Sequence, residues 1–304
     1  MSELSFSPES NRQIPEQRGL NRLMKLNREA VFKKPELIGV ENLQRIPIEK
    51  PLIIVTSHFS DSDIQTVESS LWPRLKEVRP NHTIGISIQS HNLIDPLIAP
   101  FIKLVGRENF FAYDVRYDKK NNHLQFFFNP ENFKKMAEAL QNRKDIITAA
   151  HEPLSNIPDA QWELPRRSGL GAAYLAQLAN AMLLPVAVNI QSDKPVGMSS
   201  NMKDVVKRLM TGKRPPVSVV IDKPFMLKKI DEKMLSIFKA YSARFNGLHE
   251  GSKEKAISSE ERAKTRIVLK EIREQSDMIV RKIAALLPEE KRGKWTADSE
   301  DLVI

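Results

Sequence analysis

The sequence predicts an α/β fold with a mostly parallel central sheet flanked by helices, and two observations support this class. Short apolar runs recur along the chain, and amphipathic segments separate them, with apolar residues three and four positions apart. Strands that alternate with helices in this way pack as parallel strands joined by helical crossovers. A short helical segment is expected before these units and a long helix after them.

The first elements follow from their apolar patterns. Residues 18–34 predict a helix with apolar positions on one side and basic residues elsewhere. Residues 51–57 read PLIIVTS, an apolar run that is typical of a parallel strand buried on both faces. A helix is expected next, since its apolar residues recur at helical spacing: Ile64, Val67, Leu71, Leu75 and Val78.

The alternation continues through the middle of the chain. Further strands are expected over residues 83–88, 145–149, 184–190 and 217–221. Further helices are expected over residues 133–142 and 168–181. We find no internal repeat and no low-complexity tract.

The chain is expected to have three parts: an N-terminal lead-in and basic helix over 1–36, an α/β domain over 37–245, and a linker with a C-terminal helix over 246–304. The last part begins with a polar stretch and continues into a long helix opened by a capping box of Ser258 and Glu261. The apolar stripe of this helix fits docking onto its own chain or dimerisation, and we favour docking.

Composition narrows the function classes. The 304 residues include no cysteine, which excludes disulfides, thiolate metal sites and a cysteine nucleophile. The net charge of +9 favours anionic partners, but the basic residues are scattered and aromatic residues are only 7%, so no nucleic-acid platform is expected. We find neither a secretory signal nor an apolar run that reaches the roughly 18 residues of a spanning helix. We therefore expect a cytoplasmic protein that contacts anionic membranes peripherally.

The residues 56–63, which read TSHFSDSD, carry the most promising chemistry. His58 follows the predicted strand directly, and Asp63 falls in the first turn of the next helix. The carboxyl ends of parallel strands are where ligand sites form in open sheets. A carboxylate that accepts from His Nδ1–H leaves Nε2 free to take a proton, and the hydroxyl of a substrate then serves as the nucleophile. We expect His58 to be the base and Asp63 its orienting partner.

A purely structural explanation of the same residues stays open. Asp61 or Ser62 can cap the helix, with Gln65 completing a capping box, and Asp63 can simply favour the helix dipole. The spacing also leaves open whether Asp61 or Asp63 is the partner of His58. The six histidines lack metal-ligand spacing, and a dinucleotide or phosphate loop is missing, so neither a metal nor a cofactor is expected.

Five blocks in order resemble the glycerolipid acyltransferases with a His-x4-Asp motif. The match spans roughly residues 37–228. The blocks are GVENL at 39–43 with PLIIVTSH at 51–58 and Asp63, GRENFF at 106–111, ITAAHEPLS at 147–155, LPVAV at 184–188 and IDKPF at 221–225. This resemblance implies transfer of a fatty acyl group from a thioester to a hydroxyl. Independently of the resemblance, backbone N–H groups at the start of the helix after His58 are candidate oxyanion donors.

Within that family the chain is most similar to the soluble plastid-type glycerol-3-phosphate acyltransferases. The segments DPLIAPF at 95–101 and DKKNNH at 118–123 carry this likeness. It implies acyl-CoA or acyl carrier protein as donor and glycerol 3-phosphate as acceptor, in phospholipid synthesis. The third block departs from the pattern, because that subgroup carries phosphate-binding arginines there, whereas residues 152–157 read EPLSNI and contain none. Pro153 also replaces the glycine that follows the glutamate in the broader family. Lysophosphatidate, another lysolipid and a non-glycerol acceptor therefore stay open, as does a non-catalytic lipid-binding relative.

The resemblance also nominates residues for the acceptor site. Arg107 lies in the block that carries an arginine in the family, and Glu152 lies in the third block. Four further cations are candidates for the missing phosphate contacts, although solvated loops explain them equally well: Lys119, Lys120, Arg166 and Arg167.

Overall fold

The computed structural model describes residues 13–60, 62–89, 102–103, 106–118, 123–127, 130–151, 163–164, 168–192, 210–247 and 259–295. Its strands are β1 (Glu36–Ile38), β2 (Leu52–Thr56), β3 (Thr83–Gln89), β4 (Phe110–Asp118), β5 (His123–Phe127), β6 (Lys144–Ala149), β7 (Met182–Ile190) and β8 (Val217–Ile221). Its α-helices are α1 (Gln13–Val31), α2 (Asp63–Val78), α4 (Pro130–Gln141), α5 (Gly171–Ala179), α7 (Glu232–Gly247) and α8 (Ser259–Ala285). Its 3₁₀ helices include η2 (Val40–Arg45), η4 (Arg107–Asn109) and η7 (Glu289–Lys291).

These eight strands form one sheet in the order β1-β8-β7-β2-β6-β3-β4-β5. Among the described strands, only the pairs β4–β5 and β7–β8 are antiparallel, while the other pairs are parallel. The predicted α/β class with a mostly parallel sheet is therefore confirmed. The sequence patterns missed β1, β4 and β5, because short or mixed polar segments carry little periodicity of their own. They also missed α7, whose apolar residues do recur at helical spacing.

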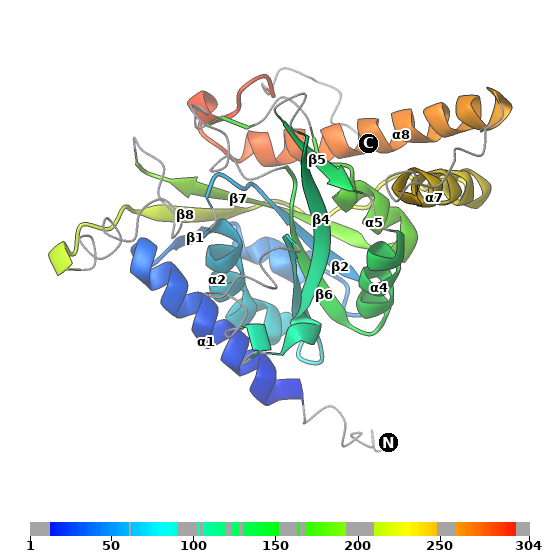
Figure 1. Cartoon of the computed structure of the whole chain (residues 1–304). Helices are drawn as coiled ribbons and strands as arrows, with labels where there is room; N and C mark the ends of the chain where they lie inside the picture. The colour runs from blue at the N-terminus through cyan, green and yellow to red at the C-terminus, as the bar shows by residue number, and fades with distance from the viewer. Residues whose placement is uncertain are drawn as a thin grey trace, which may run out of the picture.

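Helices cover both faces of the sheet (Figure 1). One face packs against α4, α5, α7 and α8, and the other packs against α1 and α2. Alternate residues of β2 serve the two cores: Ile53 and Val55 belong to the first, and Leu52 and Ile54 to the second. This explains why β2 is an unbroken apolar run, since a strand buried on both faces has no solvent side.

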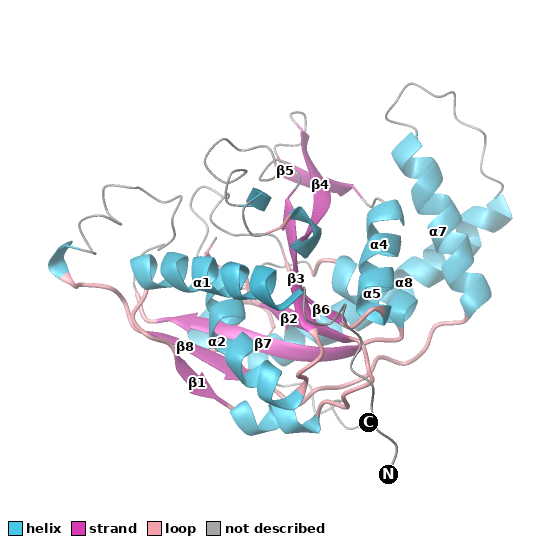
Figure 2. Cartoon of the chain, turned by 90° about the horizontal axis from the view of Figure 1, so that it is seen from below, coloured by secondary structure: helices cyan, strands magenta, loops and turns pink. Residues whose placement is uncertain are grey.

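The two terminal helices are integral to these cores. Leu20 and Met24 of α1 are buried against the face that α2 also covers. Val268, Ile272 and Ile283 of α8 are buried on the opposite face, where α8 lies beside α5 and α7 (Figure 2). The prediction that the C-terminal helix docks onto its own chain is confirmed. The boundaries predicted at 36–37 and 245–246 stay predictions.

The parallel strands give the sheet two distinct edges. Helices α2 and α5 begin where β2 and β6 end, and the connection from β7 to β8 lies at the same carboxyl edge because these two strands are antiparallel. The opposite, amino edge contains the end of α2 and the start of β6. Ligand sites of open parallel sheets form at the carboxyl edge.

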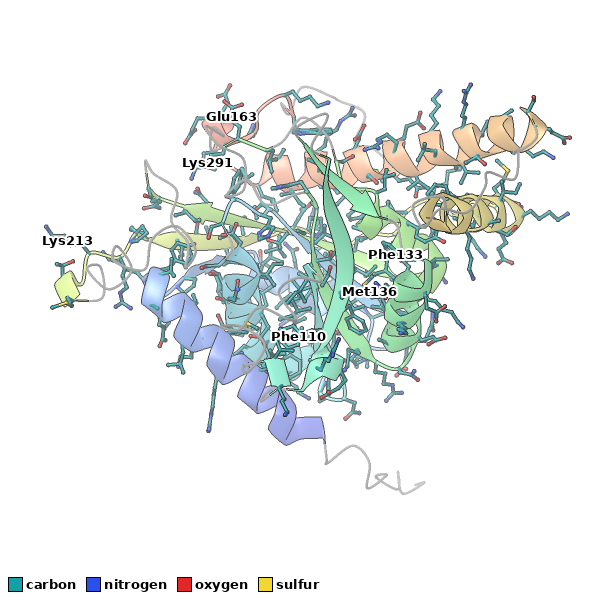
Figure 3. The ribbon with its side chains drawn as sticks, viewed as in Figure 1. Phe110, Phe133, Met136, Glu163, Lys213 and Lys291 are labelled. Atoms are coloured by element: carbon teal, nitrogen blue, oxygen red, sulfur yellow. The ribbon has the colours of Figure 1, made fainter. Side chains whose placement is uncertain are left out.

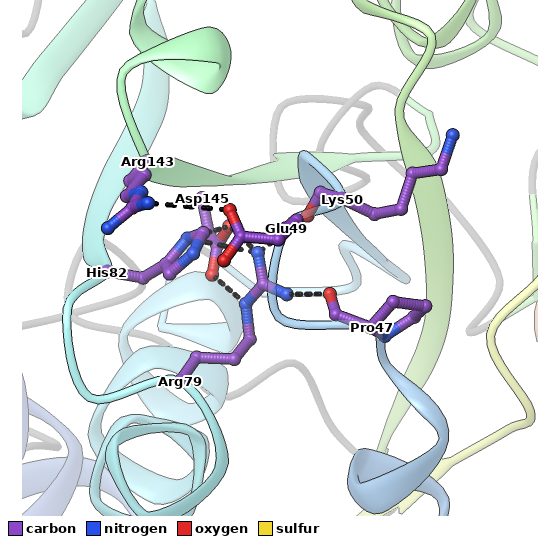
Figure 4. A network of polar contacts seen from close by, with 7 residues as sticks. All are labelled: Pro47, Glu49, Lys50, Arg79, His82, Arg143 and Asp145. Carbon is purple, nitrogen blue, oxygen red and sulfur yellow. Dashed lines mark hydrogen bonds and ion pairs between the residues drawn. The ribbon is translucent and has the colours of Figure 1, made fainter. Parts of the chain in front are cut away.

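A buried charge network closes the amino edge (Figure 4). Arg79, just after α2, donates from Nε and Nη2 to the two carboxylate oxygens of Asp145 on β6, both at 2.9 Å. Its Nη1 and Nη2 also donate to the carbonyls of Pro47 and Lys50, at 2.6 and 2.7 Å. His82 Nδ1 lies 3.1 Å from Asp145 Oδ1. One guanidinium therefore ties α2, β6 and the segment that leads into β2.

We predict that Asp145→Asn lowers the free energy of unfolding by roughly 3 kcal/mol, because removing one partner leaves the buried guanidinium uncompensated. Urea unfolding followed by circular dichroism measures the change. The matched control is Glu77→Gln, which breaks the exposed ion pair with Arg74 (3.2 Å) and should cost less than about 1 kcal/mol. Equal effects of the two substitutions would contradict the importance assigned to the buried pair.

Candidate active site

His58 lies at the carboxyl end of the central strand β2 and is only 7% exposed. Around it, side-chain atoms take part in hydrogen bonds that main-chain atoms make elsewhere in the sheet. Ser57 donates its N–H to the carbonyl of Val186 on β7, and its Oγ accepts the N–H of Val188 at 3.0 Å. On the other side, the N–H of His58 donates to Nε2 of His151 at 3.0 Å. The chain is thus held on both sides at this point, by β7 at Ser57 and by the His151 side chain at His58.

Asp63 closes the turn that carries His58 away from the sheet. Its carboxylate is fully buried, and its Oδ2 accepts the N–H of Ser60 at 2.9 Å. The N–H of Asp63 in turn donates to the carbonyl of Ser60 at 3.1 Å. The N–H of Ser62 donates to Oγ of Ser60 at 3.0 Å. The structure therefore brings His58 and Asp63 into one buried turn at the edge where ligand sites form.

Two details of the turn differ from the predicted arrangement. Nδ1 of His58 is buried without a hydrogen-bond partner among the described residues, so Asp63 binds the backbone of Ser60 rather than the imidazole. Ser62 is the N-cap of α2 but makes no side-chain cap, so the capping box with Gln65 is absent. The candidate oxyanion donors are also reduced, since the N–H groups of Ser60, Ser62 and Asp63 are used within the turn.

Burial controls the charge of this turn. It lowers the pKa of His58 to about 4, and a weaker backbone interaction with Ser60 opposes the shift. The imidazole is therefore neutral at pH 7 and able to accept a proton. On the same helix, burial raises the pKa of Glu68 to about 8, partly opposed by a hydrogen bond from Asn21, so this carboxyl is protonated at neutral pH.

Lys291 of η7, labelled in Figure 3, is a cation that the sequence patterns did not nominate. It interacts electrostatically with Asp63. It is 9% exposed, and its Nζ donates to Oδ1 of Asn189 at 2.8 Å and to the carbonyl of Ile190 at the end of β7. Burial lowers the pKa of Lys291, whereas attraction to Glu290 and then to Asp63 raises it. The C-terminal segment thus contributes a positive charge that interacts electrostatically with the carboxylate of Asp63.

The structure places Arg107 at a different edge of the sheet from His58, and its predicted contact with the acceptor stays a prediction. The paired positions that link β2 to β4 are Ile54, Ile147, Ile86 and Phe110. Arg107 precedes Phe110 by three residues and lies at the amino edge, where Lys144 Nζ binds the carbonyl of Glu108 at 3.0 Å. His58 follows Ile54 by four residues, so the strand register places Arg107 and His58 at opposite edges of the sheet.

A different arginine, Arg116, lies at the carboxyl edge of the sheet, the same edge as His58. Arg116 follows Phe110 by six residues, on the part of β4 that continues past the end of β3 at Gln89. Its position in the strand register is therefore beyond the carboxyl ends of the neighbouring parallel strands. The block match at 106–111 drew attention to Arg107 because the sequence alone does not show where β4 begins and ends.

The other predicted site residues lie outside the described part of the chain. They are Lys119, Lys120, Glu152, Arg166 and Arg167, together with Asp61 as the alternative partner of His58. Their roles stay predictions. In the described segments no group of histidine and carboxylate side chains is arranged to hold a metal ion. None of the described helices combines the length and the apolar character that crossing a bilayer requires.

Comparison with known proteins finds a weak likeness to solved structures. No protein-family model and no curated protein sequence matches the chain. A crystal structure described as the 1-acyl-sn-glycerophosphate (LPA) acyltransferase PlsC from Thermotoga maritima is similar with a TM-score of 0.41 and 13% identity. The match covers 84% of this chain and 86% of that one. A likeness this weak carries no inference about activity.

We predict that the His58 imidazole titrates near pH 4 instead of near the 6.5 of an unfolded chain, because burial disfavours its charged form. Its neutral form is favoured in the folded state, so it contributes a loss of stability as pH falls from about 6.5 towards 4. Glu68 contributes a pH dependence of stability with the opposite sign. The stability that its raised pKa provides is lost as pH rises from about 4.5 through 8.

The measurement is a two-dimensional NMR titration of the imidazole nitrogens, with the His58 signals assigned by their loss in His58→Gln. The pH dependence of whole-protein unfolding does not isolate the contribution of His58. The pH ranges over which His58 and Glu68 change the stability overlap, and the two changes have opposite slopes. An imidazole that titrates at 6.5 or above would show that the folded state leaves His58 open to solvent.

Proposed function

We propose that the protein is an O-acyltransferase that moves a fatty acyl group from a thioester to the hydroxyl of a phosphorylated glycerol acceptor. The observation that carries this proposal is the buried turn that presents a neutral His58 at the carboxyl end of β2, with the Asp63 carboxylate in the same turn. The five sequence blocks that resemble glycerolipid acyltransferases support the same reaction. The donor is acyl-CoA or acyl carrier protein, and no resident cofactor takes part.

The proposed reaction is base-assisted acyl transfer. Nε2 of His58 removes the proton of the acceptor hydroxyl as its oxygen bonds to the thioester carbonyl carbon. The tetrahedral intermediate then collapses, the carbon–sulfur bond breaks, and the imidazolium returns the proton to the leaving thiolate. Asp63 stabilises the imidazolium once its carboxylate and the ring turn toward one another. That change stays within one turn of chain, and catalytic hydrogen bonds often tighten only when substrate binds.

The acceptor is proposed to be glycerol 3-phosphate, with a lysophospholipid such as lysophosphatidate as the alternative. A phosphate group needs cations at the carboxyl edge. Arg116 lies beyond the strand ends at that edge, and Lys291 is near Asp63. Five residues remain candidates from the sequence: Glu152, Lys119, Lys120, Arg166 and Arg167. Arg107 lies at the amino edge, opposite the edge that holds His58.

A non-catalytic lipid-binding relative is the second candidate, and one observation favours it. Asp63 already binds the N–H of Ser60, and Nδ1 of His58 has no partner among the described residues. A pair held in this arrangement would bind a thioester without transferring the acyl group. Measurement of turnover separates the two candidates.

We predict that His58→Ala lowers the transfer rate by roughly 10²–10⁴-fold, because a positioned base is lost. Radiolabelled long-chain acyl-CoA and acyl carrier protein are offered with glycerol 3-phosphate and with lysophosphatidate, and the labelled lipid is counted. Arg107→Ala, at the opposite edge, is the matched control and should keep wild-type kinetics. Wild-type protein that binds acyl-CoA but yields no product with any pair would favour the non-catalytic candidate.

We also propose that the carboxyl edge faces an anionic membrane. Lys33 and Lys34, just after α1, and Lys213, before β8, are all exposed at this edge. Figure 3 shows Lys213 far out from the body of the sheet, and Met210 beside it in sequence is 83% exposed. A cationic rim with an apolar side chain would bring an anionic, acyl-bearing surface to the edge that holds His58.

We predict that reversing Lys33, Lys34 and Lys213 to glutamate weakens binding to phosphatidylglycerol vesicles at least tenfold, at roughly 1 kcal/mol per lysine. The matched control reverses three exposed lysines that follow β8 away from this edge: Lys223, Lys228 and Lys233. Vesicle sedimentation at low and high salt measures both triple variants. Equal weakening of the two would mean that net charge alone, and not this edge, determines binding.

A further inference from the structure

The ladder between β2 and β6 ends in an unusual way at His58. In a parallel pair, the N–H groups and carbonyls of the two strands alternate along the ladder. The N–H of Ala150 donates to the carbonyl of Thr56 at 2.9 Å, so the next regular rung would join the N–H of His58 to the carbonyl of Ala150. Instead the carbonyl of Ala150 accepts the N–H of Gly169 at 3.0 Å, and His58 donates to the ring of His151.

Gly169 makes this exchange of hydrogen-bond partners possible, because the loop before α5 passes close to the end of β6. A Cβ at Gly169 would lie 3.2 Å from the carbonyl oxygen of Ala150, tighter than ordinary contact. The glycine therefore lets a loop N–H occupy the acceptor that the sheet would have offered to His58. Without a second acceptor, the buried N–H of His58 would lose its hydrogen bond, at a cost of about 1–3 kcal/mol.

His151 supplies that second acceptor and contacts the next residue as well. Its ring is 4% exposed, and Nε2 lies 3.0 Å from the backbone nitrogen of His58. An imidazole nitrogen that accepts a hydrogen bond carries no proton, so the neutral ring bears its proton on Nδ1. The ring also packs edge-on against Phe59, with 6.0 Å between ring centroids. One side chain thus holds two consecutive residues at the point where the chain leaves the sheet.

We infer that His151 is a positioning residue, which fixes the direction of His58 by accepting its backbone N–H through Nε2. The catalytic part of this inference rests on the proposed function, whereas the structural part does not. Loss of the acceptor frees the N–H of His58 to seek another partner, and the imidazole then leaves its position. A displaced base should lower kcat while substrate binding, and hence KM, changes little.

Two substitutions separate hydrogen bonding from packing. His151→Leu removes the acceptor but keeps an apolar group of moderate size, whereas His151→Gln offers Oε1 as a replacement acceptor. We expect His151→Leu to lower kcat by roughly 10–100-fold with KM within about twofold, because small misplacements of a base carry such costs. His151→Gln should recover most of kcat. Thermal unfolding of both variants controls for folding.

An NMR measurement tests the hydrogen bond even if acyl transfer itself fails. In the wild-type protein, a scalar coupling across the bond should join the backbone ¹⁵N of His58 to Nε2 of His151. The amide signal of His58 should shift strongly in His151→Leu and little in His151→Gln.

The inference is overturned if the coupling is absent from wild-type protein, or if both substitutions leave the His58 signals unmoved. It is likewise overturned if His151→Gln loses as much kcat as His151→Leu while remaining folded. Wild-type protein that shows the coupling without acyl transfer would instead contradict the proposed function and leave the positioning contact standing. Should His151→Leu not fold, the wild-type coupling and the kinetics of His151→Gln still decide the question.

Discussion

The site depends on how β2 is held at the centre of the sheet. Its five residues are fully buried, with parallel neighbours on both sides and helices on both faces. A strand in this position cannot slide, because a shift of one residue would exchange the side chains that face the two cores. His58 leaves the sheet at the end of this fixed strand. Its position is therefore set by the packing of the whole domain rather than by a flexible loop.

The two edges of the sheet use buried polar groups differently. At the amino edge, Arg79 and Asp145 satisfy one another and bind nearby carbonyls, which makes a structural clamp. At the carboxyl edge, burial keeps His58 neutral and leaves its Nδ1 without a bond among the described residues. An incompletely bonded histidine in a buried turn is a costly arrangement. Such a cost at the edge where parallel sheets bind ligands is consistent with function rather than with stability alone.

The C-terminal helix α8 contributes to the fold and to the candidate site although it lies outside the segment that carries the sequence blocks. Helix α8 completes the core on one face and delivers Lys291 to the end of β7, where its charge interacts with that of Asp63. The segment from α8 to η7 is thus connected to the candidate site by electrostatics as well as by packing. Truncation before α8 would expose apolar residues of the sheet and remove this cation together.

The sequence by itself determined the fold class, because the apolar runs and helical periodicities of β2, α2, β6 and α8 are local signals that packing reinforced. It also indicated the turn between His58 and Asp63, since a strand followed by a helix fixes both ends of that turn. The tertiary structure decided what depends on strand order. It separated Arg107 from His58, placed Arg116 at the carboxyl edge and brought His151 to the backbone of His58 from 93 residues away. Spacing along the chain does not specify which strands are neighbours here, because the order depends on how the whole sheet pairs and packs in three dimensions.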